Sequence, residues 1–137
     1  MSATLALIVW YRKSLQSQIE TLATAGSGLR KAAERANASG REGDRAAATV
    51  AAENVMTASG LGVRALHKRP SPAPEFDARA TEALFAYAEA ASVLTKARKN
   101  KADLASLTPE QFHETVAAVA GAQAQLRQLS ADFLAGM

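Results

Sequence analysis

The chain has no cysteine among its 137 residues, and aromatic residues make up only 5% of it. The missing cysteines exclude disulfide bonds, thiolate catalysis and cysteine-ligated metal sites. They leave the cellular location open between membrane-associated and cytoplasmic, because both reduced and exported proteins can lack cysteine. Aromatic and β-branched residues favour strands, so their scarcity leaves almost no strand signal in the chain.

Residues that carry chemistry are also scarce. The histidines are His67 and His113, and the sequence has one Glu-x-x-His step, from Glu110 to His113. A carboxylate-bridged metal pair in a helical bundle needs two such steps and two further carboxylates. No glycine-rich loop has the strand before it and the lysine after it that phosphate binding requires. We therefore predict a protein that is not an enzyme and that has no metal site and no cofactor.

The excess of positive charge is small. The formal net charge is +3, which falls short of the dense basic stripe of a dedicated nucleic-acid binder. The basic residues are not interleaved with aromatic side chains, so bases would find no stacking platform. Nucleic acid is therefore an unlikely partner on this pattern.

Alanine is the residue that the chain has in excess, at roughly a quarter of all positions, far above ordinary usage. Alanine is the best helix former and has the smallest side chain of the good ones. The fold class that we predict is all-α, with an antiparallel up-down-up-down four-helix bundle and a long first helix. A single domain over residues 1–137 is long enough to bury a core without disulfides.

Apolar residues at alternating steps of four and three predict four helices. The first runs from about Ser2 to Ala38, the second from Arg45 to Lys68, the third from Glu75 to Arg98, and the fourth follows Thr108. The residues that we expect to face the core form one seam on each helix. In the first two helices they include Leu22, Gly26, Leu29 and Ala33, then Val50, Val55, Met56, Leu61 and Leu66. In the third and fourth they include Phe76, Ala80, Leu84, Tyr87, Ala91 and Leu94, then Phe112, Val116, Val119, Leu126, Leu129 and Phe133. Gly26-Ser-Gly28 predicts either a break in the first helix or a thin waist where a neighbouring helix comes close.

Three connections separate these helices. Residues 37–44 form the first turn, with Asp44 as the expected cap of the second helix. Residues 69–75 form a proline-rich connection between two helical hairpins, because Pro70, Pro72 and Pro74 cannot lie inside a helix. Residues 99–107 form a loop with room for one extra turn, and Thr108-Pro109-Glu110-Gln111 is a strong helix start with a capping-box spacing.

Residues 1–11 form an apolar N-terminal extension. Its nine apolar residues span about 14 Å, under half of a roughly 30 Å hydrocarbon core, so it cannot cross a bilayer alone. The side chains that we predict to contact a partner or a membrane are Leu5, Leu7, Ile8, Val9, Trp10, Tyr11, Arg12 and Lys13. The apolar ones surround a helix rather than lining one face, which favours burial in something. The aromatic-then-basic order at its end is typical of a helix leaving a membrane.

A basic end of the bundle is the second candidate surface. In an up-down-up-down bundle the first turn and the third connection share one end, where Glu34, Glu42, Asp44 and Asp103 dilute the positive charge. Such a surface attracts phosphates, acidic proteins or lipid headgroups, and ordinary solvation of helix ends is the alternative interpretation. Its residues are Arg30, Lys31, Arg35, Arg41, Arg45, Lys96, Arg98, Lys99 and Lys101.

Three functions fit these features. The first is a non-catalytic interaction or assembly module, whose apolar N-terminal extension binds another copy of the chain or a protein partner. The second is a ligand-sensing or signalling domain of a membrane-anchored receptor. The third is a nucleic-acid-coating or scaffold protein that uses the basic end, which salt-dependent binding would reveal.

Overall fold

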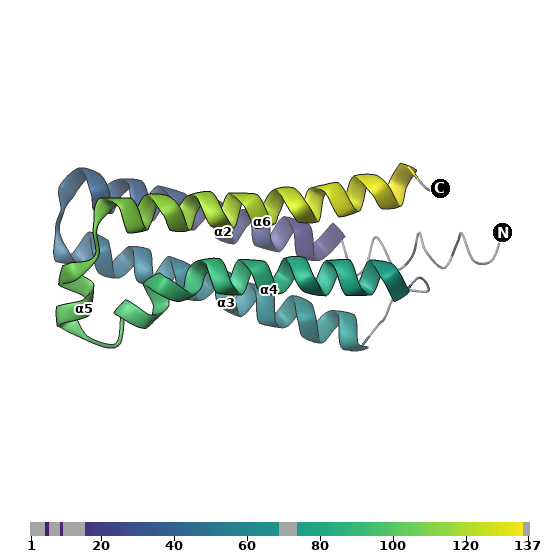
Figure 1. Cartoon of the computed structure of the whole chain (residues 1–137), viewed down its shortest axis with the longest axis horizontal. Coiled ribbons are helices and arrows are strands. Elements are labelled where there is room, and N and C mark those ends of the chain that lie inside the picture. The colour runs from purple at the N-terminus through teal and green to yellow at the C-terminus, as the bar shows by residue number, and fades with distance from the viewer. Residues whose placement is uncertain (1–4, 6–8, 10–15, 69–73, 136–137) are drawn as a thin grey trace.

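The computed structural model describes residues 5, 9, 16–68 and 74–135. No strand occurs within these ranges, which confirms the all-helical prediction. The helices are α2 (Gln16–Ser39), α3 (Glu42–Lys68), α4 (Pro74–Ala97), α5 (Lys101–Ser106) and α6 (Pro109–Ala135). The four long helices lie side by side along one axis, and the short α5 lies at one end of them (Figure 1). The main contacts form the ring α2–α3–α4–α6–α2, so the helices make a bundle.

The turn after α2 is shorter than predicted. α2 extends one residue past the predicted Ala38 and ends at Ser39. Gly40 follows with a φ of 65°, and its N–H donates to the carbonyl of Ala36 at 2.9 Å. A left-handed residue at this position is a common way to end a helix, and glycine adopts it without a steric penalty.

α3 begins three residues earlier than predicted, at Glu42 rather than Arg45. The N–H of Arg45 already donates to the carbonyl of Arg41 at 3.0 Å, so the helical bonding begins there. Asp44, which we predicted as the cap, lies instead in the first turn, where the helix dipole favours its charge together with that of Glu42. Its carboxylate accepts a hydrogen bond from the Ser39 hydroxyl across the turn.

The later helix boundaries follow the predictions closely. The N–H of Thr108 donates to Oε1 of Gln111 at 2.8 Å, and the N–H of Gln111 donates to Oγ1 of Thr108 at 3.2 Å. This reciprocal pair is the predicted capping box. The extra turn within 99–107 is α5, where the side chain of Asn100 accepts from the N–H of Ala102 at 2.8 Å. α4 begins and ends one residue before its predicted bounds, so Pro74, which we predicted to lie in the connection, is instead the first residue of the helix, where proline is tolerated because its missing N–H would have no intrahelical partner.

The buried residues of α2, α4 and α6 follow the four-three rhythm, but the large apolar residues of α3 misled the prediction. Val50 and Leu61 are exposed. The buried seam of α3 is built mostly from small residues, at Ala48, Ala52, Val55, Ser59, Gly62 and Leu66. α3 therefore buries its thinnest face, which lets the neighbouring helices approach closely. In α6 the buried seam position is Thr115, and Val116, which we predicted for the seam, is only half-buried.

The glycines at positions 26 and 28 do not interrupt α2, and those at positions 60 and 62 do not interrupt α3. α2 is continuous through Gly26 and Gly28, so the predicted alternative of a break is wrong there. A Cβ on Gly26 would lie 3.4 Å from Cγ1 of Val119 in α6, whereas one on Gly28 would meet no described atom within 4 Å. The contact at Gly26 is an ordinary van der Waals contact and Gly28 has none, so neither glycine marks the close approach that the thin-waist interpretation requires.

Candidate functional site

Most of the predicted N-terminal contact surface lies outside the described residues. This applies to Leu7, Ile8, Trp10, Tyr11, Arg12 and Lys13. The structure does describe Leu5 and Val9, which are helical and are 63% and 44% exposed. Within the described ranges, no helix is both long enough and apolar enough to cross a membrane.

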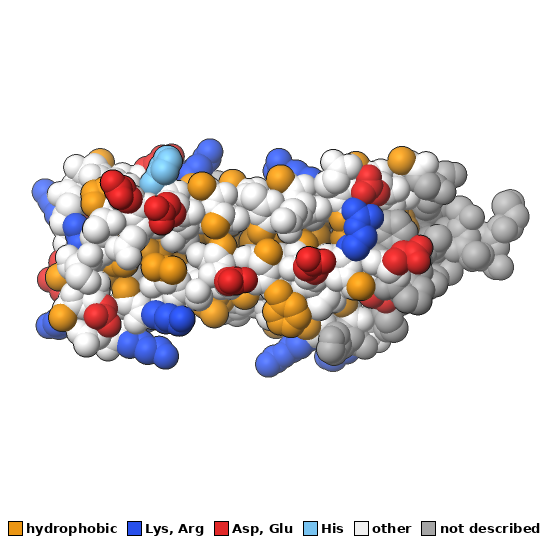
Figure 2. Space-filling view, viewed as in Figure 1, with side chains coloured by type: hydrophobic (Ala, Val, Ile, Leu, Met, Phe, Trp, Pro, Cys, Tyr) orange, Lys and Arg blue, Asp and Glu red, His pale blue; other side chains and the backbone are white. Residues whose placement is uncertain are grey.

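The predicted basic end is a mixed surface rather than an uninterrupted positive patch. Lysine, arginine, aspartate and glutamate side chains all appear around the end of the bundle where α5 lies (Figure 2). Glu34, Glu42 and Asp103 are exposed there. Arg98 forms an ion pair with Glu53 of α3, so its charge is partly neutralised. The other exposed basic residues of the predicted basic end are Lys31, Arg35, Arg41, Lys96, Lys99 and Lys101.

Arg45 has a structural role in this region. Its guanidinium donates to the carbonyl oxygens of Leu104, Ala105 and Leu107 at 3.4, 3.0 and 2.9 Å. These carbonyls lie at the end of α5, where a helix leaves acceptors without intrahelical partners. Arg45 therefore holds α5 against α3 through its Nη1 group.

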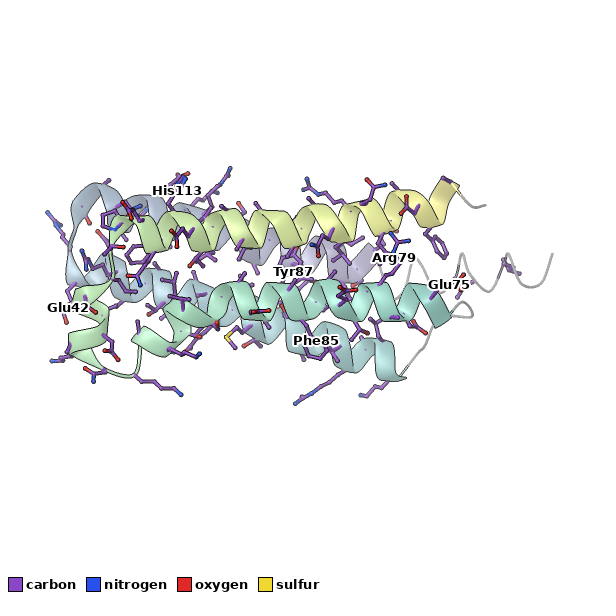
Figure 3. The ribbon with its side chains drawn as sticks, viewed as in Figure 1. Glu42, Glu75, Arg79, Phe85, Tyr87 and His113 are labelled. Atoms are coloured by element: carbon purple, nitrogen blue, oxygen red, sulfur yellow. The ribbon has the colours of Figure 1, made fainter. Side chains whose placement is uncertain are left out.

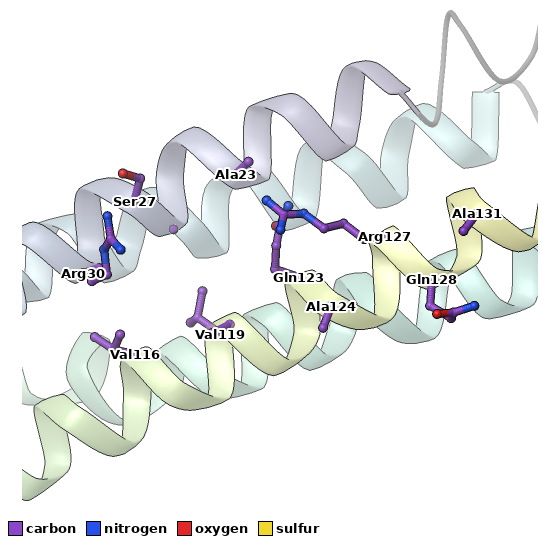
Figure 4. Close-up of a pocket in the computed structure, with 12 residues that line it drawn as sticks. Ala23, Ser27, Arg30, Val116, Val119, Gln123, Ala124, Arg127, Gln128 and Ala131 are labelled. Atoms are coloured by element: carbon purple, nitrogen blue, oxygen red, sulfur yellow. The ribbon is translucent and has the colours of Figure 1, made fainter.

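A groove between α2 and α6 is a concave feature that the sequence did not predict. Its volume is about 630 Å³. Residues with small side chains line it on both helices (Figure 4), namely Ala23 and Gly26 on α2 and Ala120 and Ala124 on α6. Of the four neighbouring pairs in the ring, α2 and α6 pack least extensively. The groove therefore follows from a seam with too little side-chain volume to fill it.

The lining of the groove is apolar and positively charged. Val116 and Val119 supply apolar surface, and Arg30 and Arg127 supply the charge. None of the described side chains that line it is acidic. Figure 4 shows Val116 on α6 opposite Arg30 on α2, with Val119 lying along the groove between Arg30 and Arg127. Arg30 was predicted as part of the basic end, and the structure places it here.

Gln123 lies in this groove with both polar atoms of its amide buried. Neither Nε2 nor Oε1 has a hydrogen-bond partner among the described residues. Gln128 is different, because its Nε2 donates to Oδ1 of Asp132 at 2.9 Å. A buried amide without partners costs about 1–3 kcal/mol per unsatisfied group, so Gln123 lowers the stability of the fold at this position.

Asp132 connects this region to α4. Its Oδ2 accepts from the guanidinium of Arg79 at 2.7 Å. The hydrogen bonds from Arg79 and Gln128 hold the pKa of the Asp132 carboxyl below its usual range. This carboxylate is engaged by Arg79 and Gln128, so it is not directed at the positive charge of Arg127.

A second unpartnered polar group lies inside the bundle near Arg127. Tyr87 of α4 is 0% exposed, and its hydroxyl has no hydrogen-bond partner in the described part of the chain (Figure 3). Burial raises the pKa of this hydroxyl well above its ordinary value, and the positive charge of Arg127 opposes that rise. The electrostatic influence of Arg127 therefore reaches from the groove to the interior.

The histidines do not join a cluster of ligands. His113 is exposed in the first turns of α6 and points away from the bundle (Figure 3), and the side chain of His67 lies outside the described set. Among the described residues, no three His, Asp or Glu side chains lie close enough together to hold a metal ion. The groove is therefore the place where the described polar, charged and apolar groups come together.

Comparison with protein families, with characterised proteins and with solved structures finds no match for this chain. The functional argument therefore rests on the residues and their geometry.

Proposed function

We propose that this protein is a non-catalytic helical-bundle module that assembles with other copies of itself through residues 1–11. The observation that carries the proposal is the exposure of Leu5 and Val9, which lie one helical turn apart and are 63% and 44% exposed. Side chains four residues apart share a helix face, so these two form an apolar strip that the bundle does not cover. Burying such a strip against a second copy removes it from water.

We also propose the antiparallel up-down-up-down arrangement for α2, α3, α4 and α6. The ring of helix contacts supports it, because each helix packs mainly on its neighbours in the chain and α6 closes on α2. The two-residue connection Gly40–Arg41 supports it further, since two residues give α3 no length in which to return along the bundle before it begins.

A ligand-sensing domain is the second candidate, and the α2–α6 groove is the observation in its favour. The nucleic-acid hypothesis has less support. Arg45 is committed to the carbonyls of α5, and acidic side chains are interspersed among the other basic residues of that end. Binding to DNA that weakens steeply with added salt would support the nucleic-acid hypothesis.

Size-exclusion chromatography with light scattering, over a range of protein concentrations, tests the assembly proposal. The full chain should self-associate, and the double variant Leu5→Ser/Val9→Ser should dissociate at concentrations where the parent does not. The matched control is Val50→Ser/Leu61→Ser, which removes two exposed apolar residues from α3 and should leave assembly unchanged.

Deleting residues 1–11 adds a test of folding. The shortened chain should keep its helical circular dichroism and lose assembly, because the described buried core runs from Leu22 to Phe133. A full chain that is monomeric at every concentration contradicts self-assembly. A deletion that unfolds the chain would show that residues 1–11 belong to the core.

A further inference from the structure

We propose that the α2–α6 groove of one copy of this chain receives α4 of a second copy. The part of α4 that enters the groove is the face that carries Glu82, Phe85 and Glu89, here called the Phe85 face. This contact goes beyond the proposed assembly through residues 1–11, since none of those residues takes part in it. Three features of the described chain select this partner: the charge of the groove, the opposite charge of the Phe85 face and the exposure of Phe85 itself.

The charge of the groove favours an acidic partner. Arg30 and Arg127 line the groove and are exposed. No acidic side chain is among the described residues of the lining, and neither arginine forms an ion pair with a described residue. Two unbalanced positive charges beside an apolar surface attract an acidic surface and repel a basic one.

The Phe85 face has the complementary charge. Glu82 and Glu89 lie on the same stripe of α4 as Phe85, because residues at steps of three and four share a helix face. Both carboxylates are exposed, and neither has an ion-pair partner in the described part of the chain. Acidic side chains are visible along α4 in Figure 2. The next basic residue on the stripe is Lys96, which lies beyond Val93, so the Phe85 face is acidic.

Phe85 supplies the apolar group that fills the groove. It is 59% exposed and is the bulkiest of the exposed apolar side chains that the structure describes. The groove has a volume of about 630 Å³ and is lined by small residues such as Ala23, Gly26 and Ala120. An aromatic ring that enters this space removes apolar surface of both copies from water.

The spacing of the charges on the two surfaces is compatible. Glu82 and Glu89 are about 10 Å apart along α4, at a rise of about 1.5 Å per residue. In the groove, Arg30 lies opposite Val116 (Figure 4), and the rise from Val116 to Arg127 is about 16 Å. Each arginine then has to lean inward by only about 3 Å, which its long side chain permits. One glutamate can therefore meet each arginine while the aromatic ring lies on the apolar floor between them.

The groove and the Phe85 face lie on opposite sides of the bundle. In the ring of helix contacts, the pair α3 and α4 lies across from the pair α2 and α6. Figure 3 shows Phe85 on the side of α4 away from α6. Two copies therefore cannot make the contact in both directions at once. Every pair keeps one free groove and one free Phe85 face, and the head-to-tail assembly continues to a third copy.

The double variant Leu5→Ser/Val9→Ser separates this contact from assembly through residues 1–11. At concentrations above those at which the parent assembles, light scattering on this variant should show masses beyond a dimer. Adding Phe85→Ser should weaken that association at least about tenfold. Adding Val50→Ser instead, which removes an exposed apolar residue of α3, should leave it unchanged. A double variant that stays monomeric at every concentration overturns the proposal. Equal assembly of the double variant and the parent counts against residues 1–11 alone.

Charge reversal in the same background identifies the two surfaces. Arg30→Glu/Arg127→Glu should abolish the association, because the groove then repels the acidic Phe85 face. Adding Glu82→Arg/Glu89→Arg reverses both surfaces and should restore it. Association that is not restored in a folded quadruple variant contradicts the pairing. Should the groove variant lose its helical circular dichroism, Glu82→Arg/Glu89→Arg alone decides, since it should abolish the association by itself.

Mixing two deficient variants tests the head-to-tail geometry. Phe85→Ser keeps its groove, and Arg30→Glu/Arg127→Glu keeps its Phe85 face. Neither should associate alone at concentrations where their mixture forms a one-to-one dimer and nothing larger, since only one contact remains. The matched control is Lys31→Glu/Arg35→Glu, which makes the same change in net charge on exposed residues of α2 outside the groove and should still associate by itself. A mixture that stays monomeric, or equal losses in the two charge reversals, contradicts the contact.

Discussion

Gly62 in α3 and Gly26 in α2 both lie inside long helices, but their surroundings differ. A Cβ on Gly62 would lie 3.0 and 3.1 Å from the two methyl groups of Leu84, and 3.1 Å from Oε1 of Gln18. A Cβ on Gly26 would meet only an ordinary contact, 3.4 Å from Val119. Glycine is therefore needed for close packing of α3 on α4, whereas on α2 its small size contributes to a groove.

This difference separates a closed side of the bundle, α3–α4, from an open side, α2–α6. A glycine inside a helix costs about 1 kcal/mol relative to alanine. At Gly62 the close approach of Leu84 offsets that cost through packing. At Gly26 no comparable contact does so, and the space beside it is part of the open groove.

The largest predicted effect comes from the closed side. Leu84→Ala should lower the free energy of unfolding by about 2–5 kcal/mol, because Leu84 is 1% exposed and its loss leaves a cavity against Gly62. Val116→Ala on the open side should cost only about 1 kcal/mol, since Val116 is half-buried beside the groove. Urea denaturation measures both. Equal losses would remove the distinction between the two sides.

Substituting the two glycines should change the free energy of unfolding by smaller amounts, with opposite signs at Gly62 and Gly26. Gly62→Ala should lower the free energy of unfolding by about 1 kcal/mol, because both methyl groups of Leu84 are too close for one rotation to relieve them. Gly26→Ala should raise it by about 0.5–1 kcal/mol, since the new methyl group makes an ordinary contact and the helix propensity improves.

Gly28→Ala serves as the reference for the Gly62→Ala and Gly26→Ala substitutions. A Cβ there meets no described atom within 4 Å, so the variant should report the gain in helix propensity alone, again about 0.5–1 kcal/mol. A rise in stability for Gly62→Ala of similar size would mean that Leu84 moves aside at little cost, and that the α3–α4 seam does not require glycine.

The sequence predicted the bundle class and several helix starts, because these depend on local signals. The capping box of Thr108 and Gln111 formed as spaced. The seam of α3 was not predicted well. Alanine occurs on every face of that helix, so the choice of Val50 and Leu61 by size gave the wrong face, while buried Ser59 and Gly62 carried no hydrophobic signal.

The groove was outside the reach of the sequence for a different reason. Its width depends on how far α2 and α6 stand apart, which the packing of all four helices decides together. Gln123 and Arg127 do carry a weak signal, because they lie four residues apart beside the seam positions Ala122 and Leu126. Polar residues adjoining a seam are ordinary in a bundle, so only their burial and missing partners distinguish them.

The smallest predicted effect concerns Tyr87, whose hydroxyl lies inside the bundle within the electrostatic influence of Arg127 on the open side. Tyr87→Phe should raise the free energy of unfolding at pH 7 by about 0.5 kcal/mol, because it removes a buried hydroxyl without a described partner. The small void that remains offsets part of that gain. Urea denaturation of the two proteins side by side measures the difference.

Alkaline pH should enlarge the difference in free energy of unfolding between the parent and Tyr87→Phe, and this shows that the difference arises from the hydroxyl. Burial raises the pKa of Tyr87 in the folded chain above the ordinary value of about 10. As the pH rises above 10, the unfolded chain releases this proton while the folded chain keeps it, so the parent loses stability by up to about 1.4 kcal/mol per pH unit. Tyr87→Phe lacks this loss, and the gap between the two proteins should widen from pH 9 to 11.

A variant that is less stable than the parent at pH 7 would show that the hydroxyl has a partner, such as a buried water molecule, and that the interior beside the open side is hydrated.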